Sequence, residues 1–254
     1  MNFNEIIDVL NIVTRQSGAI ARRYFGRQIE VTRKADRTPV TDADREVEIF
    51  LRSSLERHFP DHSILGEEFG ETRKEGPYRW VIDPIDGTQS FLLRTPLFGT
   101  LLALEENGVP VLGAIYLPVQ DQLMVGAREF GTFLNGEQCR VSGVSNLAEA
   151  RLIITDPACL TGHNADAGIA ALSQRVELTR GFGDCYGYFL VASGVADIMI
   201  DPILAYHDVA ALKPIMEGAG GTLTSRRGTE EVQLSSAVAT NRLLHKEVID
   251  IINQ

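Results

Sequence analysis

The most informative stretch of this chain reads Trp80-Val81-Ile82-Asp83-Pro84-Ile85-Asp86-Gly87-Thr88. The apolar run before Asp83 predicts a buried strand. Pro84 and Gly87 are expected to stop this strand and force a turn. Asp83 and Asp86 then project together from the end of a sheet, which is where open α/β sheets bind ligands.

Two carboxylates placed this close repel each other unless a cation lies between them. Their oxygens suit magnesium, which is held by a few carboxylates together with substrate phosphate. Gly87 and Thr88 add backbone N–H groups and a hydroxyl next to the carboxylates. The stretch therefore predicts a place where metal and phosphate meet, and the alternative for its two aspartates is an Asx-turn after the strand.

The composition is that of a globular protein and argues against nucleic-acid binding. The 254 residues are 44% hydrophobic and 23% charged, which is an ordinary globular mixture. A net charge of −10 makes nucleic acid an unsuitable partner, because a phosphate backbone needs a basic surface. The three cysteines show no CxxC spacing, and no signal peptide or apolar run of about 18 residues is visible. We expect a cytoplasmic protein with reduced thiols and no membrane partner.

The pattern of elements changes near the middle of the chain. Before it, the sequence predicts helices at 5–25 and 41–59, a loop or edge strand at 29–40, a strand at 63–66 and antiparallel strands over 98–135. Thr41 is the expected N-cap of the second helix, with Asp44 three residues on. After it, strands at 151–155, 176–182, 196–201, 221–225 and 236–240 alternate with helices at 164–174, 184–194, 208–219 and 241–252. The fold class is α/β (α+β), with an N-terminal α+β subdomain over 1–145 that carries most metal ligands. Residues 146–254 form a C-terminal α/β subdomain, and the two subdomains share one active site.

Four acidic segments of the chain resemble the inositol monophosphatase superfamily of magnesium-dependent, lithium-sensitive phosphomonoesterases. They are Thr41-Asp42, Gly66-Glu67-Glu68, Asp83-Pro84-Ile85-Asp86-Gly87-Thr88 and Asp208-Val209-Ala210-Ala211. The resemblance covers nearly the whole chain, in order. It implies a layered α-β-α-β-α sandwich, and it implies a homodimer, which is the family's default.

The resemblance also implies a set of metal ligands. Glu67, Asp83 and the Ile85 carbonyl would hold a first magnesium ion. Asp83, Asp86 and Asp208 would hold a second, and a third, weaker ion would lie near Glu67. Manganese is the alternative ion, and lithium is expected to inhibit. Asp208 also fits a plain helix N-cap.

Catalytic and phosphate-binding roles follow from the same resemblance. A hydrogen bond between Thr88 and Asp42 would polarise the attacking water, with Glu67 beside it. Backbone N–H groups of Gly87 and Thr88 would hold the phosphate. Two metals about 3.5–4 Å apart can activate water and neutralise the leaving oxygen, so no covalent nucleophile is needed. Asp42 also fits a first-turn carboxylate favoured by the helix dipole.

Substrate choice is expected to lie outside the metal ligands. The string Gly183-Asp184-Cys185-Tyr186-Gly187-Tyr188 and the segment Asp201-Pro202-Ile203-Leu204 resemble the histidinol-phosphate phosphatase branch of the superfamily. Histidinol phosphate carries an ammonium and an imidazole, and added carboxylates would pair with these donors. We therefore expect Asp184 and Asp201 to bind substrate, and the reaction to be hydrolysis of L-histidinol phosphate to L-histidinol and phosphate in histidine biosynthesis.

Alternatives stand beside these assignments. The chain can instead be an inositol-1-phosphate or broad sugar-phosphate monophosphatase of the same family. A non-catalytic binding module is disfavoured because it would be expected to lose a ligand. Asp184 also fits an N-cap and Asp201 a strand-end residue. Three further residues have roles that the sequence leaves open. Glu68 is either structural or supports the site, and Arg180 contacts either substrate or a partner subunit. For His207, packing or hydrogen bonding is favoured over metal ligation.

Overall fold

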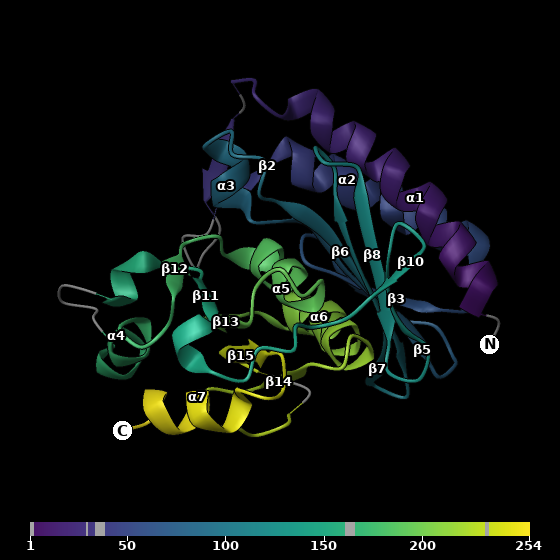
Figure 1. Cartoon of the computed structure of the whole chain (residues 1–254). Helices are drawn as coiled ribbons and strands as arrows, with labels where there is room; N and C mark the ends of the chain where they lie inside the picture. The colour runs from purple at the N-terminus through teal and green to yellow at the C-terminus, as the bar shows by residue number, and fades with distance from the viewer. Residues whose placement is uncertain (1–2, 29, 34–38, 161–165, 232–233) are drawn as a thin grey trace.

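Five layers of secondary structure stack on one another in the computed structural model (Figure 1). Two helices cover one face of an eight-stranded sheet, and two more separate that sheet from a five-stranded one, whose outer face is covered by a last helix pair. The paired helices are α1 (Phe3–Tyr24) with α2 (Asp42–His58), α5 (Asp184–Ala192) with α6 (Tyr206–Gly218), and α4 (Ala167–Ser173) with α7 (His245–Ile252). This arrangement is the α-β-α-β-α sandwich expected from the sequence. The structure describes residues 3–28, 30–33, 39–160, 166–231 and 234–254.

The described strands form two large sheets and a short ribbon. The eight-stranded sheet has the order β10-β9-β8-β7-β6-β5-β3-β4, and the five-stranded sheet has the order β12-β11-β13-β15-β14. The strands of the large sheet are β3 (Ser63–Gly66), β4 (Gly70–Thr72), β5 (Tyr78–Asp86), β6 (Gly99–Glu106), β7 (Val109–Leu117), β8 (Gln122–Ala127), β9 (Gly131–Leu134) and β10 (Glu137–Cys139). The smaller sheet contains β11 (Arg151–Ile154), β12 (Leu178–Arg180), β13 (Ile198–Asp201), β14 (Thr222–Thr224) and β15 (Ala237–Thr240), and the ribbon pairs β1 (Val31–Arg33) with β2 (Pro39–Thr41).

Strand periodicity explains why the core is divided into three clusters. In β5, Trp80 and Ile82 pack under α1 and α2, while Val81 points to the opposite face and packs with α5 and α6. In β13, Met199 faces the same central helices, and Ile198 faces α4 and α7. Successive side chains of a strand point to opposite faces, so each buried sheet contributes to two cores. The central helices are consequently apolar toward both sheets.

The expected end of the strand at Pro84 is wrong, because β5 continues to Asp86. Asp83 lies opposite Leu101 of β6, and Asp86 lies opposite Gly99. Three residue steps on β5 therefore face two steps on β6, which is a β-bulge. A bulge interrupts the hydrogen-bond ladder, so a proline without an N–H group is tolerated there.

Other boundaries differ by small amounts. Helix α6 begins at Tyr206, two residues before the predicted start, and α7 begins at His245 instead of residue 241. The short helix α3 (Thr88–Leu92) was not predicted. The predicted N-cap Thr41 is confirmed, since Asp44 closes a capping box with it. The division between subdomains near residue 145 stays a prediction, and residues 29, 34–38 and 164–165 of the predicted elements lie outside the described part of the chain.

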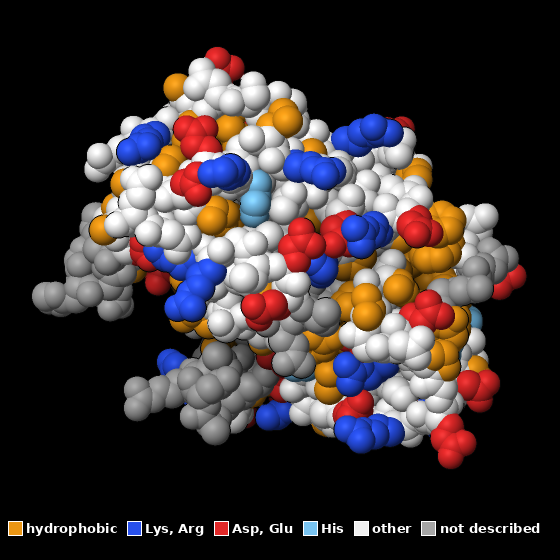
Figure 2. Space-filling view, turned by 90° about the horizontal axis from the view of Figure 1, so that it is seen from below, with side chains coloured by type: hydrophobic (Ala, Val, Ile, Leu, Met, Phe, Trp, Pro, Cys, Tyr) orange, Lys and Arg blue, Asp and Glu red, His pale blue; other side chains and the backbone are white. Residues whose placement is uncertain are grey.

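The surface carries mixed charge. On the face seen in Figure 2, basic and acidic side chains are interspersed instead of being gathered into separate fields. Among the described residues, no helix combines the length and the apolar character that crossing a membrane requires.

Candidate active site

Three carboxylates converge between the large sheet and the central helix layer. Asp83 and Asp86 come from the end of β5, and Asp208 comes from the first turn of α6; their ligand atoms lie within 4.8 Å of one another. Residues three apart in a regular strand point to opposite faces. The bulge in β5 adds one residue, so Asp83 and Asp86 both lie opposite residues of the same face of β6. The bulge thus brings the two side chains together.

The electrostatics of this cluster fit a cation. Burial raises the pKa of Asp83 well above its usual value, and the negative charges of Glu67, Asp86 and Asp208 raise it further. Burial also raises the pKa values of Asp86 and Asp208. The Oδ1 atom of Asp83 is buried and has no hydrogen-bond partner among the described residues. A divalent ion would pair this oxygen and offset the mutual repulsion.

Backbone groups fix the orientation of two of these carboxylates. The N–H of Cys185, at the start of α5, donates to Asp86 Oδ2 at 2.5 Å. The N–H of Ala205, which precedes α6, donates to Asp208 Oδ2 at 2.9 Å. The cluster therefore connects β5 to the beginnings of both central helices.

Glu67 lies beside the three carboxylates on the turn after β3. Its backbone N–H donates to the carbonyl of Ile82 at 3.2 Å, one residue before Asp83. Its charge raises the pKa of Asp83, after the larger effect of burial. The Ile85 carbonyl, another expected ligand, accepts a hydrogen bond from Thr88 Oγ1 at 3.1 Å.

The predicted hydrogen bond between Thr88 and Asp42 does not form among the described residues. The Asp42 side chain is 67% exposed and lies 3.7 Å from the Arg45 guanidinium. Its neighbour in the same helical turn, Asp44, is 2% exposed and accepts hydrogen bonds from the N–H and hydroxyl of Thr41 at 2.8 and 2.6 Å. Burial raises the pKa of Asp44 to about 6, and the charge of Glu67 contributes to the increase. Asp44 is therefore the buried carboxylate of this turn, and the charge of Glu67 acts on it.

A sequence signal for Asp44 was available. The buried face of α2 includes Val47, Leu51 and Leu55, and Asp44 precedes Val47 by three residues. Positions three and four apart share one face of a helix, so Asp44 falls on the apolar stripe and Asp42 does not.

Asp184 and Asp201 lie close enough to Asp208 for its charge to act on both. Gly87 has φ of +82°, and an ideal Cβ built there would lie 3.1 Å from Asp184 Oδ2. This distance puts the Asp184 carboxylate against the Gly87 backbone. Burial raises the pKa of Asp184 to about 6 and that of Asp201 to about 7, and the charge of Asp208 adds to both.

The three open positions differ in their surroundings. The Glu68 N–H donates to Glu48 Oε2 at 2.7 Å. Arg180 is exposed and donates to the carbonyl of its neighbour Thr179, so its described contacts do not connect it to the cluster. Both ring nitrogens of His207 are buried without a hydrogen-bond partner among the described residues, which does not support the hydrogen-bonding part of its expected role.

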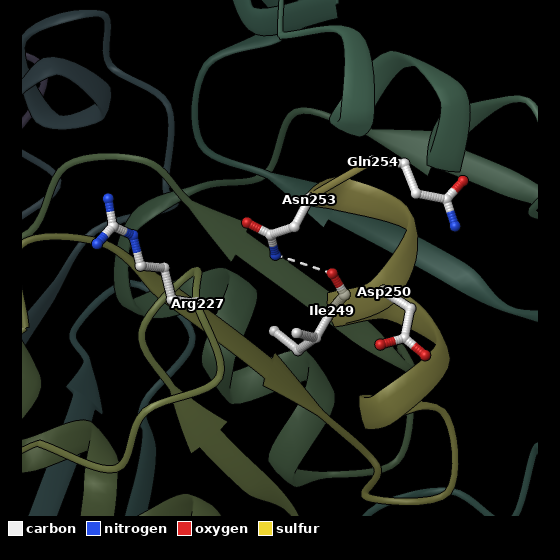
Figure 3. A pocket seen from close by; sticks show the side chains of 5 residues that line it. All are labelled: Arg227, Ile249, Asp250, Asn253 and Gln254. Carbon is white, nitrogen blue, oxygen red and sulfur yellow. Dashed lines mark hydrogen bonds between the residues drawn. The ribbon is translucent and has the colours of Figure 1, made fainter.

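A separate hollow near the end of the chain holds no comparable group of ligands (Figure 3). It is lined by Arg227, Ile249, Asp250, Asn253 and Gln254. Its single carboxylate, Asp250, pairs with Lys246 at 2.5 Å. The acidic cluster is thus the better candidate for chemistry.

The comparison with known proteins matches this geometry. Residues 3–254 match the model described as Inositol monophosphatase family. The chain belongs to the inositol monophosphatase family. A histidinol-phosphatase from Chlorobaculum parvum is 38% identical over 221 residues, covering 87% of this chain and 85% of that protein. A histidinol-phosphatase from Mycobacterium tuberculosis is 35% identical, covering 100% of this chain and 99% of that protein.

Solved structures agree with the family assignment. The extragenic suppressor protein suhB from Bartonella henselae superimposes with a TM-score of 0.92 at 27% identity, over 98% of this chain and 99% of that one. Family membership together with the histidinol-phosphatase relatives makes the chain a metal-dependent phosphatase, and its acidic cluster is compatible with metal binding.

The raised pKa values predict how the metal-free protein responds to pH. Asp184 and Asp201, with pKa values of about 6 and about 7, keep protons in the folded state that the unfolded chain loses near its ordinary value of 3.8. The folded state then binds more protons, so the free energy of unfolding falls as the pH rises from about 4 to about 7. We expect the melting temperature in chelator to be several degrees lower at pH about 7.5 than at pH about 5.5, since ~1 kcal/mol corresponds to roughly 2–4 °C at this size.

Magnesium should reverse this trend, because a bound cation favours the deprotonated carboxylates. The measurement is a set of thermal melts at both pH values, with chelator and with saturating magnesium. The double variant Asp184→Asn, Asp201→Asn should weaken the metal-free dependence, and the part that remains is due to the other carboxylates with raised pKa values, Asp44, Asp83, Asp86 and Asp208. A melting temperature in chelator that rises with pH over this range would contradict the prediction.

Proposed function

We propose that the chain is a magnesium-dependent phosphomonoesterase that hydrolyses L-histidinol phosphate to L-histidinol and phosphate, a step of histidine biosynthesis. The observation that carries this proposal is the position of Asp184, whose carboxylate lies 3.1 Å from an ideal Cβ on Gly87 and acts electrostatically on Asp86. Asp201 contributes a second carboxylate whose pKa is affected by Asp184 and Asp208. Similarity to histidinol-phosphatases over most of the chain supports the same substrate.

Each part of the site has a role in this reaction. Asp83, Asp86 and Asp208, with Glu67 and the Ile85 carbonyl, would hold two to three magnesium ions. Bound magnesium supplies Lewis acidity and a water of lowered pKa. The protein's own contribution is to fix these oxygens on β5 and α6. The ions that would neutralise the phosphate charge are then in place before the substrate binds.

The phosphate and the water need further groups. Backbone N–H groups of Gly87 and Thr88 would bind phosphate oxygens. The left-handed backbone of Gly87, with φ of +82°, suits successive N–H groups that point together toward an anion. The Thr88 hydroxyl donates its hydrogen bond to the Ile85 carbonyl. Its oxygen would accept a hydrogen bond from the attacking water and so orient that water. Asp42 would support the Thr88 hydroxyl by turning from Arg45 toward it, while Asp44 holds the start of α2 through its hydrogen bonds from Thr41.

The organic end of the substrate determines specificity in this proposal. The ammonium of histidinol phosphate, and its imidazole when protonated, would donate charge-assisted hydrogen bonds to Asp184 and Asp201. An inositol phosphate has only hydroxyl groups at that end, so it would leave the buried Asp201 and the half-buried Asp184 without a charged partner. The site therefore favours a cationic substrate.

The deciding experiment compares phosphate release from L-histidinol phosphate and from inositol 1-phosphate in the presence of magnesium. We expect kcat/KM to be roughly a hundredfold or more higher for histidinol phosphate, equivalent to about 3 kcal/mol of discrimination. Equal rates, or a preference for inositol phosphate, would instead identify a broad inositol or sugar monophosphatase. Loss of all activity with both substrates would refute the phosphatase assignment itself.

The remaining properties are proposed from the family resemblance. The enzyme is a cytoplasmic homodimer, manganese replaces magnesium with retained activity, and lithium inhibits by occupying the second metal position. Sedimentation would test the dimer, and lithium titration at fixed magnesium would test the inhibition.

A further inference from the structure

Glu48 is a completely buried carboxylate that the reaction does not use. It lies on α2, one helical turn after Asp44, and its side chain is 0% exposed. A buried charge is costly unless it is paired and hydrogen-bonded. The contacts that satisfy Glu48 therefore indicate what it is kept for.

Both oxygens of Glu48 hold the turn that follows β3. Oε2 accepts the N–H of Glu68 at 2.7 Å, and Oε1 accepts the N–H of Phe69 at 3.2 Å. The preceding N–H, that of Glu67, donates to the Ile82 carbonyl on β5. Three consecutive backbone groups are thus fixed, one to β5 and two to α2, and Glu67 is the first of the three.

Gly66 makes this close approach possible. An ideal Cβ at residue 66 would lie 1.8 Å from Glu48 Oε1, so any larger residue would displace the carboxylate. The absence of a side chain at Gly66 leaves the space beside the end of β3 that the Glu48 carboxylate occupies.

Arg52 completes the arrangement from the next turn of α2. Its Nε donates to Glu48 Oε1 at 2.7 Å, and its Nη1 donates to Thr72 Oγ1 at 3.2 Å. Its Nη2 donates to the Gly70 carbonyl on β4. The pair therefore ties α2 to the turn and to β4, and the arginine supplies the charge that Glu48 requires.

We propose that Glu48 and Arg52 are positioning residues that hold the Glu67 backbone in register with Asp83 and thereby set the magnesium affinity of the site. This inference rests on the proposed function, in which Glu67 is a metal ligand. Groups that orient a metal ligand without touching the metal typically change metal affinity when replaced.

The test is magnesium binding by isothermal titration calorimetry, together with the magnesium dependence of phosphate release. Glu48→Gln keeps the side-chain shape, but its amide presents a donor to one of the two N–H groups. We expect magnesium affinity to fall roughly tenfold or more. At saturating magnesium, kcat should recover to within about threefold of wild type, because the ligands themselves are intact. Glu56→Gln, on an exposed position of the same helix, is the matched control and should leave both quantities unchanged.

Arg52→Gln is the second variant, and it applies if Glu48→Gln does not fold. Arg52 is partly exposed, so this variant is expected to fold with a several-fold loss of magnesium affinity. Unchanged affinity in the folded variants, or a lowered kcat with unchanged affinity, would overturn the inference.

Asp83→Asn separates this inference from the proposed function. If Asp83→Asn removes magnesium binding while Glu48→Gln and Arg52→Gln match wild type, only the positioning role fails. If the wild-type chain binds no magnesium, both the metal assignment and the positioning role are wrong.

Discussion

Asp83→Asn is expected to lower kcat/KM by roughly a thousandfold or more, about 4 kcal/mol of transition-state stabilisation. Asp83 is the buried member of the cluster, and Glu67, Asp86 and Asp208 all act on it electrostatically. The amide keeps the shape of the side chain but removes the charge that two cations would share. Repulsion among the remaining carboxylates also falls, so the metal-free variant should fold and should be no less stable than wild type.

The measurement is steady-state phosphate release, with circular dichroism and thermal melts to establish folding. Asp250→Asn provides the matched control, since its side chain is 53% exposed on α7 and pairs only with Lys246 among the described residues. Activity of Asp83→Asn near that of wild type would rule out Asp83 as a shared metal ligand.

Asp184→Asn is expected to reduce the preference for histidinol phosphate over inositol 1-phosphate by about 10- to 100-fold. A hydrogen bond to a charged group contributes roughly 1.5–3 kcal/mol, and this contribution is lost for the cationic substrate only. Asparagine is the suitable replacement because Asp184 has φ of +55°, a conformation that asparagine tolerates and alanine does not. The effect should appear mainly in the ratio of kcat/KM values, with activity on inositol phosphate retained.

Asp201→Asn serves as the companion variant. Asp201 lies at the end of β13 and also accepts the N–H of Ile203 at 3.3 Å, a bond that the asparagine oxygen can keep. We expect a decrease in preference of the same sign. Unchanged preference in both variants would place substrate discrimination elsewhere in the site.

The sequence predicted best what depends on local chemistry. The capping box of Thr41 and Asp44, the apolar alternation of β5 and the glycine turn at Gly87 are all set within a few residues. The layered fold followed from the family resemblance together with the change from antiparallel strands to alternating strands and helices. The assignment of the family is confirmed by the match over residues 3–254.

Features that depend on distant partners were harder to predict. Pro84 is a strong local stop signal, and only the pairing of β5 with β6 shows that the strand passes through it as a bulge. Asp42 and Asp44 are both acidic residues in the first turn of α2, and the choice between them depends on which face of the helix is buried. The roles of Glu48 and Arg52 depend on a turn about twenty residues away, at Glu68 and Gly70.

The central helix layer has a consequence for the order in which the molecule is synthesised. All strands of the large sheet have been synthesised once Cys139 is added, but the helix that covers their inner face ends only at Gly218. Until then Val81, Leu101 and Ile115 have no cover from α6, and such an uncovered apolar face favours aggregation. The nascent chain is therefore expected to depend on chaperones, and a fragment that ends near residue 145 is expected to be insoluble.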